Sequence, residues 1–187
     1  MEPAATATAL MEHSLTETRD FDAVVHLYWP RVFRFALASL RDRDAAEALT
    51  QDCFLHAFKA WERFRGEASI QTWLMRIAVN LVRDASRNRR VQFWKRLRSG
   101  DSEEIGGYAR DGRLSPEAET LLREQIAGIW KATACLPERQ KSVFLLRFAD
   151  DMTLLEIAGA TGLSENAVKV HLYRALRAVR AQMGRSE

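Results

Sequence analysis

The chain has 187 residues, 47% hydrophobic and 28% charged, with a formal net charge of +3, which fits one or two folded domains with a real core. It contains no run of about 20 apolar residues and does not start with the basic and apolar pattern of a signal peptide, so we expect no membrane insertion and a cytoplasmic location. Its two cysteines, Cys53 and Cys135, form no disulfide framework and no metal-ligand spacing, and we expect no metal site and no cofactor.

Residues 21–64 have the apolar periodicity of helices. One apolar face runs from Phe21 to Tyr28, and Pro30 predicts a break before a second face from Val32 to Leu40. A third apolar stripe, between Ala45 and Phe64, leaves an acidic, amide and apolar mixture on its opposite side: Glu47, Gln51, Asp52 and Leu55. This mixture suits either a protein-docking surface or a solvated face, and the pattern alone favours the solvated face.

The next predicted helix, at about residues 70–87, has two chemically distinct sides. Its core side carries Leu74, Ile77, Ala78, Leu81 and Ala85. Its polar arc carries Thr72, Arg76, Asn80, Arg83 and Arg87, with Trp73 at the edge. A row of cations can follow a phosphate backbone, and an amide or an aromatic ring can bind an exposed base. The alternative is a solvated basic face with Trp73 packed in the core.

Two segments around this helix have their own composition. The loop Arg65–Ser69, of sequence RGEAS, contains glycine and could let a flipped-out base approach the backbone. Residues 83–98 hold seven basic residues and one acid, Asp84, whereas residues 101–119 hold six acids, two arginines, three glycines and Pro116. The second composition has little capacity to pack, so residues 91–117 are predicted to link two domains.

The stretch from Thr153 to Arg177 is the most informative part of the chain. Thr153 and Glu156 fit a capping box, Gly162 suits a tight turn, and Ser164 suits the N-cap of a second helix. Val168, Leu172 and Leu176 form the predicted buried stripe of that helix. Its other face carries groups suited to a DNA major groove: Glu165, Asn166, Lys169, Val170, His171, Tyr173 and Arg174. An ordinary helical hairpin with a solvated polar face is the alternative.

Two blocks of this sequence carry a family resemblance. AEALTQDCFLHAFKAWERFRGEASIQTWLMRIAVNLVRD (residues 46–84) and LPERQKSVFLLRFADDMTLLEIAGATGLSENAVKVHLYRALRAVR (residues 136–180) resemble bacterial RNA polymerase sigma factors of the extracytoplasmic function (ECF) group. The resemblance extends over about residues 21–183, apart from the linker. It implies an all-α fold of two helical domains joined by a flexible linker: a tail at 1–20, sigma region 2 at 21–90, a linker at 91–117 and sigma region 4, with its helix-turn-helix, at 118–183.

The resemblance also implies roles for the surfaces above. Region 2.2 binds the clamp helices of the largest polymerase subunit, which assigns docking to Glu47, Gln51, Asp52 and Leu55. Regions 2.3 and 2.4 open the promoter and capture an unpaired base of the minus-ten element, which assigns this element to Arg65, Ser69, Thr72, Trp73, Arg76, Asn80, Arg83 and Arg87. The second helix of region 4 reads the minus-thirty-five element, which assigns that element to Glu165, Asn166, Lys169, Val170, His171, Tyr173 and Arg174.

The implied partners are core RNA polymerase, through its clamp helices and the flap of its second-largest subunit, promoter DNA, and an anti-sigma protein. The implied function is to direct polymerase to specific promoters in a regulated or stress response. A stand-alone helix-turn-helix regulator is the alternative. We expect no enzyme activity, because the sequence shows no clustered carboxylates, His and Cys ligands or glycine-rich phosphate loop.

Some positions depart from the pattern of the family. Relatives often have Arg or Ser-Arg where Val170 and His171 stand, and Arg where Leu176 stands. A neutral histidine attracts phosphate less than a cation does, so Lys169 and Arg174 are expected to be the main anchors. The adjacent aspartates at positions 150 and 151 are expected to be loop caps or solubility groups.

Overall fold

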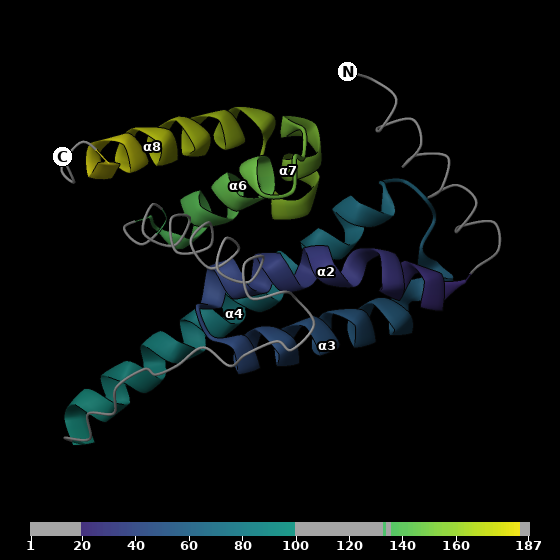
Figure 1. Ribbon diagram of the computed structural model, residues 1–187, viewed down its shortest axis with the longest axis horizontal. Helices are drawn as coiled ribbons and strands as arrows, with labels where there is room; N and C mark the ends of the chain where they lie inside the picture. The colour runs from purple at the N-terminus through teal and green to yellow at the C-terminus, as the bar shows by residue number, and fades with distance from the viewer. Residues whose placement is uncertain (1–19, 100–132, 134–135, 184–187) are drawn as a thin grey trace, which may run out of the picture.

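The structure is a computed structural model that describes residues 20–99, 133 and 136–183, and these residues form helices and turns without a strand. The first group contains α2 (Phe21–Leu40), α3 (Arg43–Ala60), the short 3-10 helix η1 (Trp61–Arg63) and α4 (Ile70–Ser99). The second contains α6 (Glu138–Phe148), α7 (Leu154–Thr161) and α8 (Glu165–Met183). The predicted all-α fold is confirmed (Figure 1).

Side-chain caps define the helical hairpin at the start of the chain. The Asp20 carboxylate accepts a hydrogen bond from the Ala23 amide at 3.1 Å, and Asp42 accepts one from the Ala45 amide at 2.9 Å. Such caps satisfy amides that lack a partner in the first turn of a helix. Arg41 adopts a left-handed conformation with φ of 58°, so α2 ends and α3 begins within two residues.

Pro30 does not break the first helix, and this part of the sequence-based prediction is wrong. α2 is continuous from Phe21 to Leu40 with Pro30 inside it. Proline removes one backbone hydrogen bond to the carbonyl four residues earlier, that of His26. Both residues lie on the exposed side of α2, where water can satisfy the carbonyl. The buried side is uninterrupted from Val24 through Tyr28 and Val32, so packing keeps the helix whole.

The first three helices enclose a core with an aromatic end. Large side chains such as Tyr28, Phe35 and Leu74 are almost fully buried there. The Cys53 thiol donates to the Leu74 carbonyl at 3.7 Å, and burial raises the pKa of this thiol to about 12. A chain of ring contacts runs over α2, α3, η1 and α4 at this end. Its members are Phe21, Phe54, Phe58, Trp61, Phe64 and Trp73.

The second group contains the predicted helix-turn-helix. The Thr153 hydroxyl accepts from the Glu156 amide at 3.3 Å while the Glu156 carboxylate accepts from the Thr153 amide at 2.7 Å, which confirms the capping box. Gly162 has a φ of 69°, which a residue without Cβ adopts at little cost. Ser164 accepts from the Ala167 amide at 3.2 Å at the start of α8. Each local feature read from the sequence of this turn is therefore present.

The two groups pack directly on each other. α6, α7 and α8 lie on one side of α2 and α4, and α3 lies on the other side (Figure 1). α7 contacts α4, and α6 contacts both α2 and α4. One cluster of buried apolar side chains runs through both groups, from Val24 in α2 to Val168 in α8. The domains therefore share a core in this arrangement.

α4 is longer than the sequence predicts. It continues past Arg87 to Ser99 and projects beyond the other helices in Figure 1. Residues 91–99, expected to belong to the linker, are thus helical in the structure. Their cationic composition is not a helix-breaking one, because arginine and lysine have high helix propensity. Residues 100–117 of the expected linker and residues 1–19 of the expected tail lie outside the described residues.

Candidate DNA-binding and docking surfaces

An exposed polar row follows the middle of α4. Arg76, Asn80, Arg83 and Arg87 are all exposed, as predicted from their spacing. The Arg83 guanidinium donates to the Asn80 side-chain oxygen at 3.0 Å. This hydrogen bond holds the Asn80 amide in one orientation and leaves its nitrogen, a donor, available. The row therefore combines cations for phosphates with an oriented amide for a base.

Thr72 does not belong to this exposed row. Only 5% of its surface is exposed, its hydroxyl accepts from the Ser69 hydroxyl at 3.0 Å, and its methyl group points at Gly159 of α7. Met75, Val79 and Val82 are buried with it. The sequence predicted a single apolar side for this helix, but α7 covers a second one. In this arrangement Thr72 cannot contact DNA directly.

The loop before α4 and Trp73 lie beside this row. Arg65 is exposed, Gly66 has a φ of 73°, and Ser69 caps α4 by accepting from the Thr72 amide at 3.1 Å. The Trp73 ring lies 4.8 Å from the Phe64 ring and is partly buried. The Trp73 ring therefore packs on its aromatic neighbour while part of the residue stays exposed, which agrees in part with the core alternative; its role in base binding stays a prediction.

α8 presents most of its predicted groove-reading face to solvent. Glu165, Asn166, Lys169, Val170, Tyr173 and Arg174 are exposed. Lys169 forms an ion pair with Glu165 at 2.8 Å, one turn earlier in the helix. His171 differs from the others because it is partly buried, and its Nδ1 atom is buried without a hydrogen-bond partner. The buried stripe behind this face includes Val168, Ala175 and Val179, while Leu172 and Leu176 are only partly buried.

The predicted docking face on α3 is also accessible. Glu47, Gln51, Asp52 and Leu55 are exposed, with Leu55 at 48%. Phe58, next to this face, is 60% exposed and was not predicted as a surface residue. Its position three residues after Leu55 could have indicated it, because residues at this spacing are neighbours on a helix surface. The α3 surface is therefore more apolar than its predicted members suggest.

The C-terminal domain also exposes large apolar side chains. Phe148 at the end of α6 and Leu155 in α7 are exposed, and the Phe148 ring packs 4.7 Å from that of Phe144. Neither residue was predicted from the sequence to have a function. Exposed large apolar side chains such as these can contribute to a protein-binding surface.

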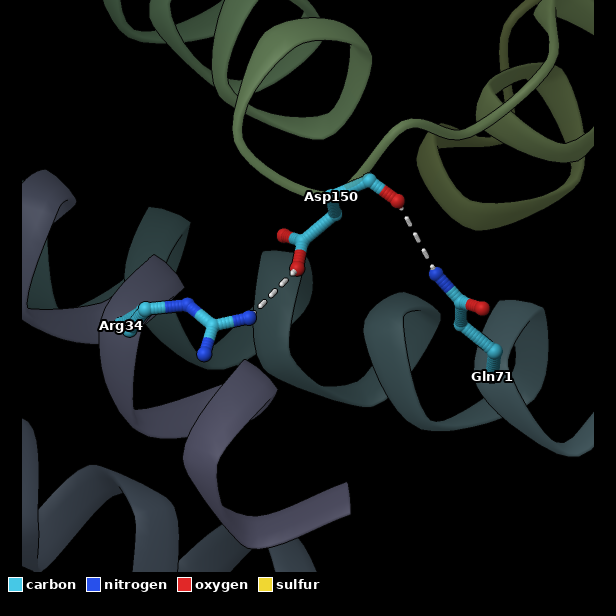
Figure 2. A network of polar contacts seen from close by, with 3 residues as sticks. All are labelled: Arg34, Gln71 and Asp150. Atoms are coloured by element: carbon cyan, nitrogen blue, oxygen red, sulfur yellow. Dashed lines mark hydrogen bonds and ion pairs between the residues drawn. The ribbon is translucent and has the colours of Figure 1, made fainter. Parts of the chain in front are cut away.

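Asp150 is not the solvent-exposed loop group that was expected. It follows α6, is only 5% exposed, and neither carboxylate oxygen has a hydrogen-bond partner. Arg34 of α2 lies 4.0 Å away, and the Gln71 side chain of α4 donates to the Asp150 backbone carbonyl at 3.4 Å (Figure 2). Burial raises the pKa of Asp150 to about 6, although Arg34 and Arg31 oppose the shift. Asp151, by contrast, is exposed.

The described part of the chain contains no group of three or more His, Cys, Asp or Glu side chains placed to hold a metal ion. Among its helices, none has the length and apolar character needed to cross a membrane.

Comparison with known proteins decides between the two candidate classes of DNA-binding protein. Residues 24–92 match the family model "Sigma-70 region 2", and residues 127–179 match "Sigma-70, region 4". The chain is 30% identical over 155 residues to the RNA polymerase sigma factor SigV of Bacillus subtilis, covering 83% of this chain and 86% of SigV. This chain belongs to the sigma-70 family. It is 26% identical over 166 residues to the ECF RNA polymerase sigma factor SigW of the same organism, covering 87% and 88% of the two chains.

Solved sigma-factor structures have the same fold. CnrH, solved in complex with the cytosolic domain of CnrY, matches with a TM-score of 0.69 at 20% identity, over 97% of this chain and 99% of CnrH. RpoE from Bartonella quintana, solved in complex with the anti-sigma factor NepR, matches with a TM-score of 0.68 at 20% identity, over 89% and 98%. The chain is thus an ECF sigma factor, which directs RNA polymerase to promoters at the start of transcription.

Proposed function

We propose that this sigma factor divides its work among three surfaces. The row on α4, with Arg65, Ser69 and Trp73 beside it, binds and opens the minus-ten element. The exposed face of α8 reads the minus-thirty-five element, and the α3 face docks on the clamp helices of polymerase. The observation that supports this division best is the Asn80–Arg83 hydrogen bond, which holds an amide ready for an unpaired base in an exposed basic row. We assign Thr72, which is buried, to positioning the Ser69 end of the loop.

Binding energy is sufficient for this function. Unstacking a base costs a few kcal/mol, which a pocket for the displaced base can offset. Each good base contact in the major groove contributes about 1–3 kcal/mol of discrimination. Attaching both domains to one polymerase raises the effective concentration of each at its element. The proposed cycle therefore requires no bond cleavage by the sigma factor, and we assign it no catalytic residue.

Exposed apolar side chains support the protein partners in this proposal. Leu55 and Phe58 on α3 offer apolar surface beside the charged Glu47 and Asp52, which suits the polymerase clamp. Phe148 and Leu155 suit the polymerase flap. An anti-sigma protein that covered the α3 face would block docking and hold this factor inactive in the cytoplasm until a signal arrives.

The experiment that tests the proposal compares footprints on genomic promoters with and without core polymerase, followed by sequencing of transcript starts. We expect protection of both elements, and new transcript starts, only when core polymerase is present. Protection of the same sites by the purified chain alone would instead support a stand-alone regulator. Leu55→Glu should reduce polymerase binding, whereas Glu62→Gln, an exposed change in η1 outside the α3 face, should not.

A further inference from the structure

The contact between the two domains is direct and includes specific polar pairs. Ser86 of α4 donates to the Glu138 carboxylate of α6 at 3.2 Å, and Gln71 of α4 donates to the Asp150 carbonyl. At Gly159 of α7 a Cβ atom would lie only 3.1 Å from the Thr72 methyl group. The backbone of α7 therefore approaches α4 as closely as packed helices do.

This packing is incompatible with binding both promoter elements at once. The two elements are separated by about 25 base pairs, which is about 85 Å of B-form DNA. α7 has eight residues, so it is about 12 Å long, and it leads directly into α8 through the turn at Gly162. With α7 seated on α4, the exposed faces of α4 and α8 cannot be that far apart. The domains must separate before both elements are occupied.

We propose that the packed arrangement is a closed state that cannot engage a promoter, and that Asp150 weakens this state when its carboxylate ionises. The promoter half of this proposal depends on the proposed roles of α4 and α8, whereas the conformational half does not.

The surroundings of Asp150 explain why its charge would disfavour the closed state. The carboxylate is buried where the turn after α6 meets α2 and α4, and no described donor forms a hydrogen bond with it. Arg34 lies at the 4.0 Å limit of an ion pair, and its own side chain is 52% exposed, so water screens the attraction. Burying a charge without hydrogen bonds costs more than such a distant, screened partner returns.

Other charged groups around Asp150 act less directly. On α2, Arg31 and Arg34 favour the ionised form, and the neighbouring Asp151 opposes it. On α6, the Arg147 guanidinium is already bonded to the Met152 carbonyl at 3.0 Å, and α4 presents the uncharged Gln71 amide. The Glu138 carboxylate is a separate ionisable group of the same interface. Lys141 lies three residues after Glu138 on α6, where burial lowers the pKa of Lys141 although Glu138 opposes the shift.

The direction of the pH effect follows from the raised pKa of Asp150. The closed state binds the proton more tightly than an open state in which this carboxyl has its ordinary pKa of 3.8. The closed state therefore loses stability relative to the open state as pH rises from 3.8 towards about 6, and changes little above that value. A difference of about two pH units corresponds to a change of up to about a hundredfold in the closed-to-open ratio.

The experiment measures energy transfer between fluorophores attached through azide-bearing residues at positions 59 and 177, which are exposed on α3 and α8. The full chain is used without DNA or polymerase. We expect the closed fraction to fall as pH rises from about 4 to about 7, with circular dichroism showing that the helices persist. Asp150→Asn should remove this dependence and keep the chain closed. The matched control Asp151→Asn should retain the dependence, with its midpoint at slightly lower pH because Asp151 no longer opposes ionisation of Asp150.

Two further results decide the proposal. Arg34→Gln should lower the closed fraction above about pH 6 and change nothing near pH 4, because Arg34 interacts only with the ionised carboxylate. In transcription assays at about pH 7.5, Asp150→Asn should reduce promoter opening while Asp151→Asn does not. If Asp150→Asn kept the parent pH dependence, Glu138 or another group would be responsible and the proposal would be wrong. An open chain at every pH would also overturn it, whatever the outcome of the footprinting test.

Discussion

The two domains of this sigma factor obtain their stability in different ways. α2, α3 and α4 enclose large side chains such as Tyr28, Phe35 and Leu74 among themselves, with a chain of aromatic contacts at one end. Among the described residues, the C-terminal helices have a separate buried cluster of Leu136, Ala175 and Val179. Their other buried apolar residues belong to the cluster shared with the first domain. In our proposal, the domain with the larger core of its own opens the promoter, and the domain that depends on the shared cluster reads the upstream element.

The two domains share buried apolar surface that must be exposed when they separate. Buried apolar side chains of α4 and α7, such as Val79 and Ile157, lie in the shared cluster. Separation of the domains would expose part of this surface to water, at a cost of about 25 cal/mol for each Å². Docking on polymerase can offset the cost by covering the C-terminal domain. The free chain is therefore expected to favour the closed state whenever Asp150 is protonated.

The largest effect is expected from truncation in the core of the first domain. Phe35→Ala should lower the free energy of unfolding by about 3–5 kcal/mol, because the ring is 1% exposed and its removal leaves a cavity. Denaturant unfolding followed by circular dichroism measures this. Phe58→Ala, which truncates a mostly exposed ring, is the matched control and should cost much less. Equal costs would show that the first domain has no dedicated core, and the comparison of the two domains would fail.

The next largest effect is expected from the exposed polar row on α4 of the first domain. Asn80→Ala should lower open-complex formation by about tenfold, equivalent to about 1.4 kcal/mol, and leave the affinity for core polymerase unchanged. Permanganate reactivity of the minus-ten bases measures the opening. The control Asn88→Ala changes another exposed asparagine of α4 that lies outside the polar row, and it should have no effect. A loss of polymerase affinity in Asn80→Ala would mean that this face of α4 docks protein.

A smaller effect is expected on the exposed face of α8, which we propose reads the upstream element. Lys169→Ala and Arg174→Ala should each weaken recognition of the upstream element by severalfold, about 1 kcal/mol. The effect for Lys169 is limited because its ion pair with Glu165 must be broken before it contacts DNA. Transcription from a promoter with the element, compared with one in which it is scrambled, measures the loss. Equal activity of parent and variants on the intact promoter would exclude this face of α8.

The smallest effect is expected from the N-terminal cap of α7. Thr153→Ala removes one half of the capping box of α7 and should cost about 1 kcal/mol, whereas Thr153→Ser should retain the cap. Hydrogen exchange of α7 and α4 amides would show whether the loss is confined to the second domain. If α4 lost protection to the same extent, the two domains would unfold as one unit.

The features that sequence reasoning predicted correctly are local ones. The Thr153–Glu156 capping box, the turn at Gly162 and the exposed row on α4 depend on residues within a few positions of each other. Sequence reasoning failed where a distant element decides the outcome. Thr72 and Asp150 are polar residues that become buried only because α7 and the turn before it pack on the first domain.

Pro30 is a similar case. Proline destabilises the interior of an isolated helix, but packing of the continuous buried side of α2 outweighs the lost hydrogen bond. The extension of α4 was missed because a change in composition was read as the end of the helix, although cationic residues are compatible with one.

The buried thiol of Cys53 provides the protein with a built-in reporter. A thiol reagent attacks the thiolate, and a pKa of about 12 leaves almost none of it at neutral pH in the folded chain. Modification at this position must therefore wait until α3 and α4 come apart. The rate at which Cys53 reacts would therefore measure how often the first domain itself unfolds. Separation of the two domains leaves α3 and α4 packed together and the sulfur covered, so it would not be detected.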